Sequence, residues 1–430
     1  MVAVERLVGA YNAWATNGAA KAPGWLQDIR RDAIARFASL GFPNMKQEAW
    51  RFTSVAPIAE GSFELARPPA RVPTLEAIRS FLLLEAGPRL VFVDGFFQPS
   101  LSTPLLDHVQ SLVDVVAHRP ELIQQHLGQY AGTLDRPFSA LNTAFVSDGA
   151  FVHVPAKTTM AEPIQLLFLA SGAKHFVTHP RNLIVLEREA RASVVETYAS
   201  LDRGVYWTNS VTEIVAGDGA RVDFHRVQRE STTAYHVATT QTHQGRDSTV
   251  NVHTVAFGAA LARHDIGAVM AGPGGRLILN GLYLLDGAQH ADHQTTIDHA
   301  AHHCESHEYF NGVLDGKSRG VFTGRIIVRP GAQKTDSKQT NNNLLLSAEA
   351  HADSQPQLEI YADDVKCTHG STVGPLDPRA MFYLQSRGVG EHDARRMLTY
   401  GFAAEILGRM EVAPLRAQLD AIVRGRLAEQ

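Results

Sequence analysis

The amino-acid sequence predicts a mainly β protein, in which a right-handed parallel β-helix core lies between N-terminal and C-terminal helical domains. Three observations support this fold class. From about Ala150 onward, short runs alternate between apolar and polar side chains, with almost no helical period. These runs return after similar small-residue turns, and helical patterns are confined to the two ends of the chain. A β-sandwich is the competing fold, but its strands come about every 8 to 12 residues with hairpin signals.

Residues 1–88 are expected to form the N-terminal helical domain. From Val4 to about Leu40, apolar residues recur at helical spacing, and Gly41-Phe42-Pro43 stops the pattern. A connecting segment at residues 89–149, which opens with the strand-like run RLVFVDGFF, leads into the core.

The β-helix core is predicted at residues 150–369. Similar turns precede its runs at Asp148-Gly149-Ala150, Asp218-Gly219-Ala220, Gly274-Gly275-Arg276 and Asp286-Gly287-Ala288. We take successive strands to begin at Arg191, Arg221, Ser248, Arg276 and Arg319. The spacings between these residues are 30, 27, 28 and 43. A recurrence of about 20 to 30 residues is typical of stacked β-coils. We expect Asn341-Asn342-Asn343 to form a polar corner before a buried strand that begins at Leu344.

Residues 370–430 are predicted to form the C-terminal helical domain. Asp377 fits a helix N-cap, Pro378 the first helical position, and Gly388 the stop. A second helix is expected from about Glu391 to Met410, and a third begins near Pro414. The apolar stripe of the second helix is expected to pack in a core, through Ala394, Met397, Leu398, Phe402 and Ile406.

Composition narrows the classes of function. The chain has 430 residues, 44% of them hydrophobic, and a net charge of -4, which does not favour nucleic-acid binding. Its two cysteines cannot form a disulfide framework and fit a reducing compartment, so we expect a cytoplasmic protein. The start MVAVERLVGAYNAWA lacks signal-peptide features, and no apolar run is long enough to span a membrane.

Two near-matches to catalytic motifs do not predict an enzyme. Gly316-Lys317-Ser318-Arg319-Gly320 fits the hydrolase pattern G-x-S-x-G, but a strand-like run follows where that motif needs a helix. GVLDGKS, from Gly312, falls one residue short of a phosphate-binding loop and lacks the same helix. We therefore expect no catalysis by this chain, and any ATP-driven step implies a partner.

Cys367 and His369 form the main chemical signal, within YADDVKCTHGSTVGPLD. If one strand runs from Leu358 to His369, alternation places Cys367 and His369 side by side and away from the apolar face of Leu358. Alternatively, Asp363-Asp364 turns the chain and breaks this alternation. A thiolate and an imidazole suit iron, iron–sulfur clusters, zinc or copper better than magnesium. A chance pair without ligand function is the competing interpretation.

A second group of histidines surrounds Cys304. Its members are His290, His293, His299, His302, His303 and His307. Imidazole and thiolate side chains in such a group could bind a transition metal, and His299 and Cys304 are the residues to test first. The alternative is that these histidines alternate outward into water.

Longer blocks of sequence resemble one family. The stretch Ser318–Val389 reads SRGVFTGRIIVRPGAQKTDSKQTNNNLLLSAEAHADSQPQLEIYADDVKCTHGSTVGPLDPRAMFYLQSRGV and resembles the SufB/SufD family of iron-sulfur cluster assembly proteins. GFPNMKQEAWRFTSV and RLVFVDGFFQPSLS resemble the same family, as does DHQTTIDHAAHHCESHEYF. The tail HGSTVGPLDPRAMFYLQSRG is similar to the SufD branch. The resemblance covers nearly the whole chain and implies the same β-helix.

This resemblance implies a non-catalytic subunit of a SufB-SufC-SufD scaffold. His369 and Cys367 would bind iron or a nascent iron–sulfur cluster, with Asp363 or Asp364 orienting the imidazole. A cluster generally needs about four protein ligands, and this pair supplies two at most. The remaining ligands would come from another polypeptide, which the resemblance identifies as a SufB-like paralogue in a heterodimer.

The resemblance also implies that the C-terminal region binds a SufC-like ABC ATPase. The candidate contact residues are Phe382, Tyr383 and Leu384. A reduced flavin in the whole complex and a homodimer in the absence of the paralogue are further expectations. Two alternatives remain open: a β-helix carbohydrate-active enzyme, and a purely structural paralogue of SufB.

Overall fold

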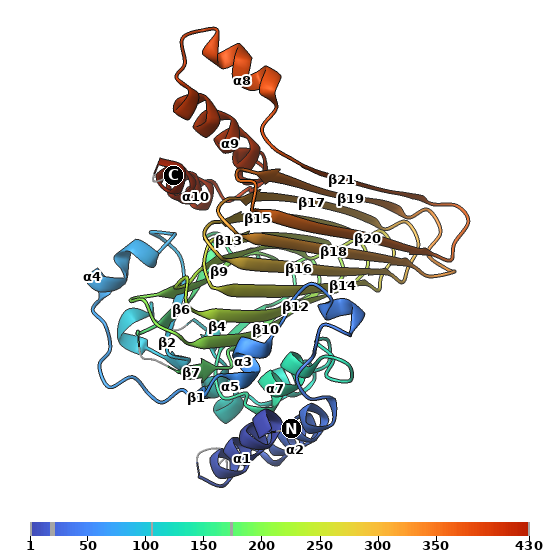
Figure 1. Cartoon of the computed structure of the whole chain (residues 1–430). Helices are drawn as coiled ribbons and strands as arrows, with labels where there is room; N and C mark the ends of the chain where they lie inside the picture. Colours follow the sequence, from blue (N-terminus) through green and yellow to red (C-terminus); the bar gives the residue numbers. More distant parts are fainter. Residues whose placement is uncertain (1, 18–21, 105, 173–174, 429–430) are drawn as a thin grey trace.

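The computed structural model, which describes residues 2–17, 22–104, 106–172 and 175–428, shows a parallel β-helix with helices at both ends of the chain (Figure 1). Successive strands of the core alternate between two sheets, so each coil adds one strand to each sheet. From residue 191 onward, neighbouring strands within a sheet run parallel and in register. Two short strands, at residues 96–97 and 109–111, pair antiparallel with their neighbours. The predicted mainly β fold with a parallel β-helix is confirmed.

The inward-facing side chains of the two sheets fill the space between them, which we call the lumen. Sheet A contains β1 (Glu64–Leu65), β4 (Val109–Ser111), β5 (Ala150–Val154), β7 (Phe176–Thr178), β8 (Arg181–Leu186), β10 (Trp207–Ala216), β12 (Tyr235–Gln244), β14 (Leu261–Met270), β16 (His290–His299), β18 (Arg319–Val328) and β20 (His351–Ile360). Sheet B contains β2 (Arg89–Val93), β3 (Phe96–Phe97), β6 (Ile164–Ala170), β9 (Arg191–Ser200), β11 (Arg221–Arg229), β13 (Thr249–Ala256), β15 (Arg276–Leu285), β17 (Glu305–Leu314), β19 (Asp336–Leu345) and β21 (Lys366–Gly374). Sheet A thus takes one short strand from the predicted N-terminal domain, while sheet B begins at Arg89 in the predicted connecting segment and ends past residue 369.

The strand register gives the length of each coil. Arg221 pairs with Thr249, and Thr249 pairs with Arg276, so these coils take 28 and 27 residues. The predicted step of 43 residues from Arg276 to Arg319 is wrong as a coil length. Arg276 pairs with Glu305 in sheet B, whereas Arg319 opens a strand of sheet A. The strand that opens at Glu305 was missed, and it gives a coil of 29 residues.

The corner before the strands of sheet B explains the missed strand. Gly219 and Gly274 occupy this corner with φ of 67° and 75°, a region that favours glycine. In the next coil His303 takes the same place with φ of 60°. Its backbone N–H donates to the carbonyl of Gln333 in the following coil at 2.9 Å. Backbone hydrogen bonds between coils therefore hold this corner even where the residue is not glycine.

The asparagine triplet does not form a corner, which corrects the prediction. Asn341, Asn342 and Asn343 lie inside β19, and Asn341 and Asn343 face the lumen with 1% and 4% exposure. The amide of Asn343 donates to Asn341 Oδ1 at 2.8 Å, and the Tyr283 hydroxyl donates to Asn343 Oδ1 at 2.6 Å. Hydrogen bonds to other lumen side chains make these polar residues stable inside a strand.

Most of the N-terminal helices cover the outer face of sheet A: α1 (Val2–Asn17), α2 (Gly24–Leu40), η1 (Glu48–Trp50), α3 (Ala56–Glu60), α5 (Leu112–His118), α6 (Glu121–Gln124) and α7 (Pro137–Ala144). The short helices α4 (Leu75–Ile78), η2 (Arg79–Phe81) and η3 (Pro99–Leu101) pack instead on the first strands of sheet B. Phe37 of α2 and Phe138 of α7 belong to one apolar cluster with Trp207 of sheet A. The stretch that was expected to be helical, from Val4 to about Leu40, forms two helices. Helix α2 ends at Leu40, directly before Gly41, as predicted.

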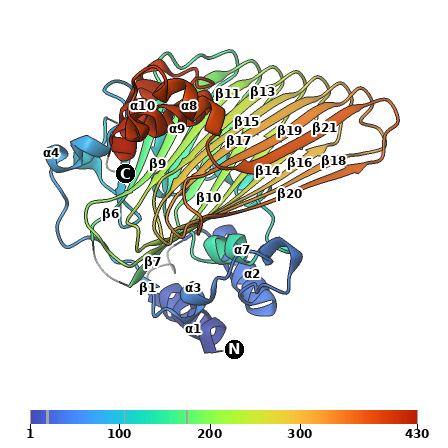
Figure 2. The same ribbon diagram turned by 45° about the horizontal axis from the view of Figure 1, so that its top comes forward.

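Two of the C-terminal helices, α9 (Glu391–Leu407) and α10 (Ala413–Ala428), cover the outer face of sheet B, on the other side of the core from α1 and α2 (Figure 2). Helix α8 (Pro378–Gln385) has no buried residue, and Asp377 caps it as predicted. Leu415 and Leu419 of α10 pack in one cluster with Val227 and Val255 of sheet B. In the predicted stripe of α9, Met397 is 52% exposed. None of the helices in the described residues is long and apolar enough to cross a membrane.

Candidate functional site

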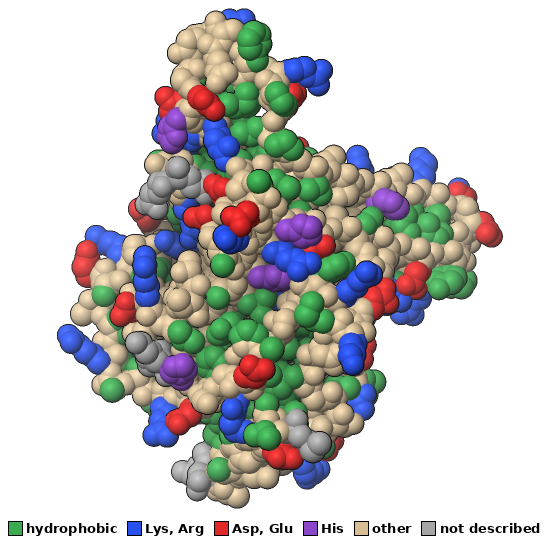
Figure 3. Space-filling model, viewed as in Figure 1, with side chains coloured by type: hydrophobic (Ala, Val, Ile, Leu, Met, Phe, Trp, Pro, Cys, Tyr) green, Lys and Arg blue, Asp and Glu red, His purple; other side chains and the backbone are tan. Residues whose placement is uncertain are grey.

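The last coil, formed by β20 and β21, leaves the lumen open at its end. Each of these strands is the final one of its sheet, so each has a hydrogen-bonded neighbour along one edge only. Apolar side chains remain exposed on this coil: Ile360 at 41%, Tyr361 at 61% and Val373 at 49%. Figure 3 shows hydrophobic side chains at this end, toward the right of the view. Unpaired sheet edges beside exposed apolar side chains are typical of a surface that another chain covers.

The chain turns at Asp363-Asp364, so Leu358 and His369 do not share a strand. Leu358 lies in β20 of sheet A, and His369 lies in β21 of sheet B. Asp364 forms an ion pair with Lys334, and its backbone N–H donates to Gln333 Oε1 at 2.9 Å. The turn is the alternative that the sequence left open. The acidic pair thus stabilises a corner, and its role in orienting the imidazole stays a prediction.

Cys367 and His369 lie side by side on the lumen face of β21. In the register of sheet B, Cys367 pairs with Ser337 and His369 pairs with Gln339, and both partners are buried in the lumen. Cys367 is half-buried, whereas His369 is exposed at the mouth of the lumen. The pair is therefore adjacent, as expected. It does not avoid the apolar face, because Cys367 packs on the apolar cluster that includes Val328.

Burial raises the pKa of the Cys367 thiol, and the negative charge of Asp336 raises it further. The free side chain is thus a thiol rather than a thiolate at neutral pH. A metal ion that binds this sulfur has to displace the proton. The neighbouring imidazole of His369 is the other nitrogen or sulfur donor that the lumen face of β21 offers.

The second group of candidate ligands is dispersed. His299 lies in the lumen, where its Nε2 is 2.8 Å from Ser306 Oγ, and burial lowers its pKa to about 4. Cys304 is buried, its thiol donates to the Gly272 carbonyl at 3.4 Å, and burial raises its pKa. Within the described ranges, no group of three or more His, Cys, Asp or Glu side chains is placed to hold a metal. Ligation by His299 and Cys304 stays a prediction without a formed site.

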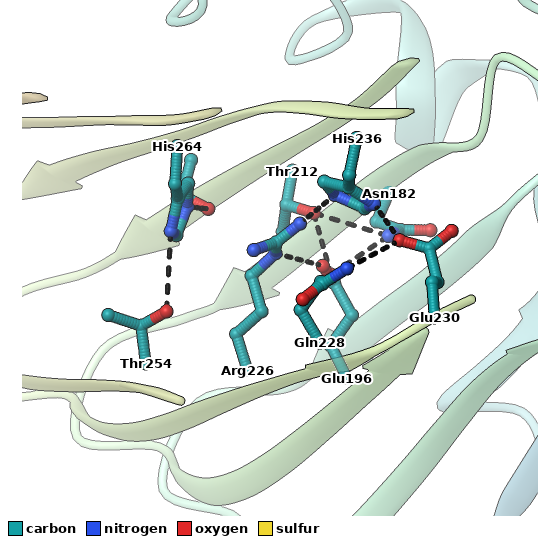
Figure 4. A network of polar contacts seen from close by, with 10 residues as sticks. Asn182, Glu196, Thr212, Arg226, Gln228, Glu230, His236, Thr254 and His264 are labelled. Atoms are coloured by element: carbon teal, nitrogen blue, oxygen red, sulfur yellow. Dashed lines mark hydrogen bonds and ion pairs between the residues drawn. The ribbon is translucent and has the colours of Figure 1, made fainter. Parts of the chain in front are cut away.

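A polar network that sequence reasoning did not predict fills the middle of the lumen (Figure 4). Arg226 Nε lies 3.4 Å from Glu196 Oε1, and Arg226 also contacts His236. His236 Nδ1 is 2.5 Å from Glu230 Oε2, and Asn182 donates to Glu196 Oε2 at 2.9 Å. These side chains are at most 5% exposed. Because each charged group has an opposite charge or a hydrogen-bond donor beside it, the network holds strands together rather than offering a free ligand position.

Helix α8 presents a separate exposed surface. None of its residues is buried, and Phe382 and Tyr383 are 71% and 55% exposed, while Leu384 is half-buried. Figure 3 shows hydrophobic side chains on the C-terminal helices at the top of the view. Arg387 stacks over the Tyr383 ring, with its Cζ 4.5 Å from the ring centre. This helix is joined to β21 by a short segment, so it stands next to the open end of the lumen.

Comparison with known proteins covers almost the whole chain. Residues 168–402 match the family model described as "SUF system FeS cluster assembly, SufBD core domain", and residues 2–166 match "SufBD protein N-terminal region". An iron-sulfur cluster assembly SufBD family protein of Synechocystis is 34% identical over 93% of this chain and 91% of its own length. The iron-sulfur cluster assembly protein SufD of Escherichia coli is 31% identical over 90% of both chains, and that of Bacillus subtilis is 26% identical over 94% of both.

Proposed function

Because the chain belongs to the SufBD family of iron-sulfur cluster assembly proteins, we propose that it is a non-catalytic subunit of a SufB-SufC-SufD scaffold. In this role it contributes Cys367 and His369 to the site where iron or a nascent cluster is held. The iron and the cluster are cargo, which the scaffold assembles and passes on. A carbohydrate-active enzyme is not favoured, because the family match spans both the core and the N-terminal region.

The observation that carries this proposal is the position of Cys367 and His369 on the lumen face of the terminal coil. A buried pair deeper in the lumen would be closed to a second protein. On β21 the pair lies beside a sheet edge that has no neighbouring strand. A paralogue with the same β-helix can extend both sheets by strand pairing and bring its own side chains to this mouth.

The number of ligands supports a shared site. Four protein ligands are usual for an iron–sulfur cluster, and histidine replaces cysteine only in some centres. Cys367 and His369 supply two, and the Cys304 thiol is directed to the Gly272 carbonyl of the preceding coil. We infer that a SufB-like paralogue provides the remaining ligands in a heterodimer. A homodimer through the same edges is the expected state when the paralogue is missing.

We also propose that α8 binds a SufC-like ABC ATPase, chiefly through Phe382 and Tyr383. Exposed aromatic residues on a helix with no buried side chain support this assignment, because such residues anchor many protein interfaces. The unpaired thiols fit a reducing compartment, and we place the complex in the cytoplasm. Association of a reduced flavin with the whole complex stays a prediction.

The first test is to isolate the tagged chain from its own cells without oxygen and identify its partners by native mass spectrometry. The expected result is one assembly that contains an ABC-type ATPase and a larger SufB-like chain. Recovery of the protein only alone or as a homodimer contradicts the scaffold assignment.

The second test replaces His369 with Ala and measures iron and sulfide bound to the isolated complex. Cluster content is expected to fall while the partners remain bound, because His369 is exposed at the mouth of the lumen. His351→Ala is the matched control, since His351 is an exposed histidine at the start of β20, in the same coil. Normal cluster content in the His369 variant would favour a purely structural paralogue.

A further inference from the structure

A line of buried polar side chains runs down the lumen beneath His369. In the register of sheet B, His369 of β21 pairs with Gln339 of β19, and Gln339 pairs with Glu308 of β17. Gln339 is 1% exposed and Glu308 is 2% exposed. Neighbouring strands lie about 4.8 Å apart, so Gln339 is one strand and Glu308 two strands inward from the mouth. Among the described residues, β21 is the one strand of sheet B beyond β19, so it lies between Gln339 and the mouth of the lumen.

The amide of Gln339 has one bonded end and one free end. Its Nε2 donates to Glu308 Oε2 at 2.5 Å. Its Oε1 is buried and has no hydrogen-bond partner among the described residues. A buried amide oxygen without a donor is unfavourable, and such groups are rare in native proteins. The next side chain along the column is His369, and a neutral imidazole carries one ring N–H that can donate to this oxygen.

The opposite sheet leaves room for Gln339. A Cβ atom at Gly324 of β18 would lie 1.9 Å from Gln339 Nε2. Glycine at this position therefore lets the glutamine side chain extend across the lumen. Contact with Gly324 on one side and the hydrogen bond to Glu308 on the other fix the amide in place. A fixed acceptor at this depth can set the orientation of a ring that covers it.

We propose that Gln339 is a positioning residue for His369. Its Oε1 accepts the ring N–H of His369, so the second ring nitrogen is unprotonated and directed to the mouth of the lumen. This inference rests on the proposed function, in which that second nitrogen binds iron. Histidines that bind metals commonly donate their other ring N–H to a carboxylate or carbonyl oxygen, which fixes the tautomer. Glu308 acts one step further inward, by holding the amide of Gln339.

The test is the tautomer of His369, measured by ¹⁵N NMR of ring-labelled histidines in the full chain. The spectrum is recorded near pH 8.5, about two units above the usual imidazole pKa, and the His369 signals are assigned with His369→Gln. In the unaltered chain we expect a single fixed tautomer, with one protonated and one unprotonated nitrogen. Gln339→Leu, which removes the acceptor, is expected to give averaged shifts for both nitrogens.

Two further variants separate positioning from a general loss of structure. Ser337→Ala removes a buried hydrogen bond of the same strand, since Ser337 Oγ lies 2.8 Å from Ser306 Oγ, yet Ser337 stands beneath Cys367. This control is expected to leave the His369 tautomer fixed. Gln339→Glu combined with Glu308→Gln exchanges the donor and acceptor of this hydrogen bond, keeps an acceptor oxygen at the same reach, and is also expected to keep the tautomer fixed. Averaged shifts in the unaltered chain, or a fixed tautomer in Gln339→Leu, would overturn the proposal.

Cobalt(II) titration of the full chain distinguishes this inference from the proposed function. Binding that depends on His369 is expected, and Gln339→Leu is expected to weaken it by about tenfold or more. Fixed tautomer without His369-dependent cobalt binding would keep Gln339 as a positioning residue and reject iron binding by His369. His369-dependent binding together with an averaged tautomer would reject the positioning role and keep the metal role.

Discussion

Replacing Phe382 with Ser gives the sharpest test of ATPase binding by α8. Phe382 is 71% exposed, so its substitution removes almost no packing from the free protein. A phenylalanine side chain presents about 200 Å² of surface, and a partner that covers the exposed part would bury roughly 140 Å². At about 25 cal/mol per Å², this burial contributes roughly 3 kcal/mol to binding. The dissociation constant for the ATPase is therefore expected to rise roughly 100-fold.

The assay is isothermal titration calorimetry of the purified chain with the SufC-like ATPase. Leu134→Ser is the matched control, because Leu134 is 73% exposed but belongs to the N-terminal part of the chain. Both variants should unfold at the temperature of the unaltered chain. An unchanged dissociation constant for Phe382→Ser, with Tyr383→Ser added, would show that the contact lies elsewhere. Point substitutions are preferable to truncation after Asp377, since truncation also removes α9 and α10 from the outer face of sheet B.

Three further predictions concern the lumen. Arg226→Leu leaves the buried carboxylate of Glu196 without its cation, so it should destabilise the fold by roughly 3–5 kcal/mol and lower the urea midpoint. Replacing both Arg226 and Glu196 by Leu should restore most of the lost stability. Burial raises the pKa of Glu308 to about 7. The contribution of its protonated carboxyl to the free energy of unfolding is therefore complete below the ordinary pKa of about 4.5, and it is lost as the pH rises through 7. Glu308→Gln should therefore raise the urea midpoint relative to the unaltered chain at pH 8.5 and not at pH 4.5. Gly324→Ala should destabilise the last coil, because its Cβ would meet Gln339, and hydrogen exchange of β19 and β21 would report this.

The fold was predictable to the extent that corners use glycine. Gly219 and Gly274 marked coils that the sequence analysis found, because glycine readily adopts positive φ. Glu189, His303 and Lys334 occupy the same corner with φ near 60° and carry no such signal. Backbone hydrogen bonds between stacked coils hold them there, and Lys334 also forms an ion pair with Asp364. The strand at Arg191 was still found from its alternation, although Glu189 occupies its corner, whereas the strand at Glu305 was not, and the apparent step of 43 residues resulted.

The alternation of apolar and polar residues along the strands did not predict which side chains face the lumen. In an ordinary half-exposed sheet the apolar face is the buried one. Here Val227 faces outward, under the C-terminal helices, while its neighbour Arg226 faces the lumen. Val195 and Glu196 show the same inversion. Both faces of these strands are buried, so alternation alone does not show which residue of each pair faces the lumen. His293 and His299 likewise point into the lumen rather than into water.

The sequence predicted which residues form the candidate site better than it predicted which face of the strand they occupy. Cys367 and His369 are two residues apart within one strand, and any strand puts such residues on the same face. Which face they occupy depends on the turn at Asp363-Asp364, and the sequence left that turn open. Gln339 was missed because it precedes His369 by one coil, and only the register of sheet B brings the two together.

The proposed roles of α8 and of β21 meet in the chain that joins them. β21 ends at Gly374 and α8 begins at Pro378, so only three residues separate the strand that carries His369 from the helix assigned to the ATPase. β21 is held by β19 along one edge only, and is thus less restrained than any inner strand of sheet B. By contrast, α9 is tied to the core where Asn311 donates to the Phe402 carbonyl at 2.9 Å. A movement of the ATPase that displaces α8 would therefore act first on β21, and through it on the orientation of His369 over Gln339.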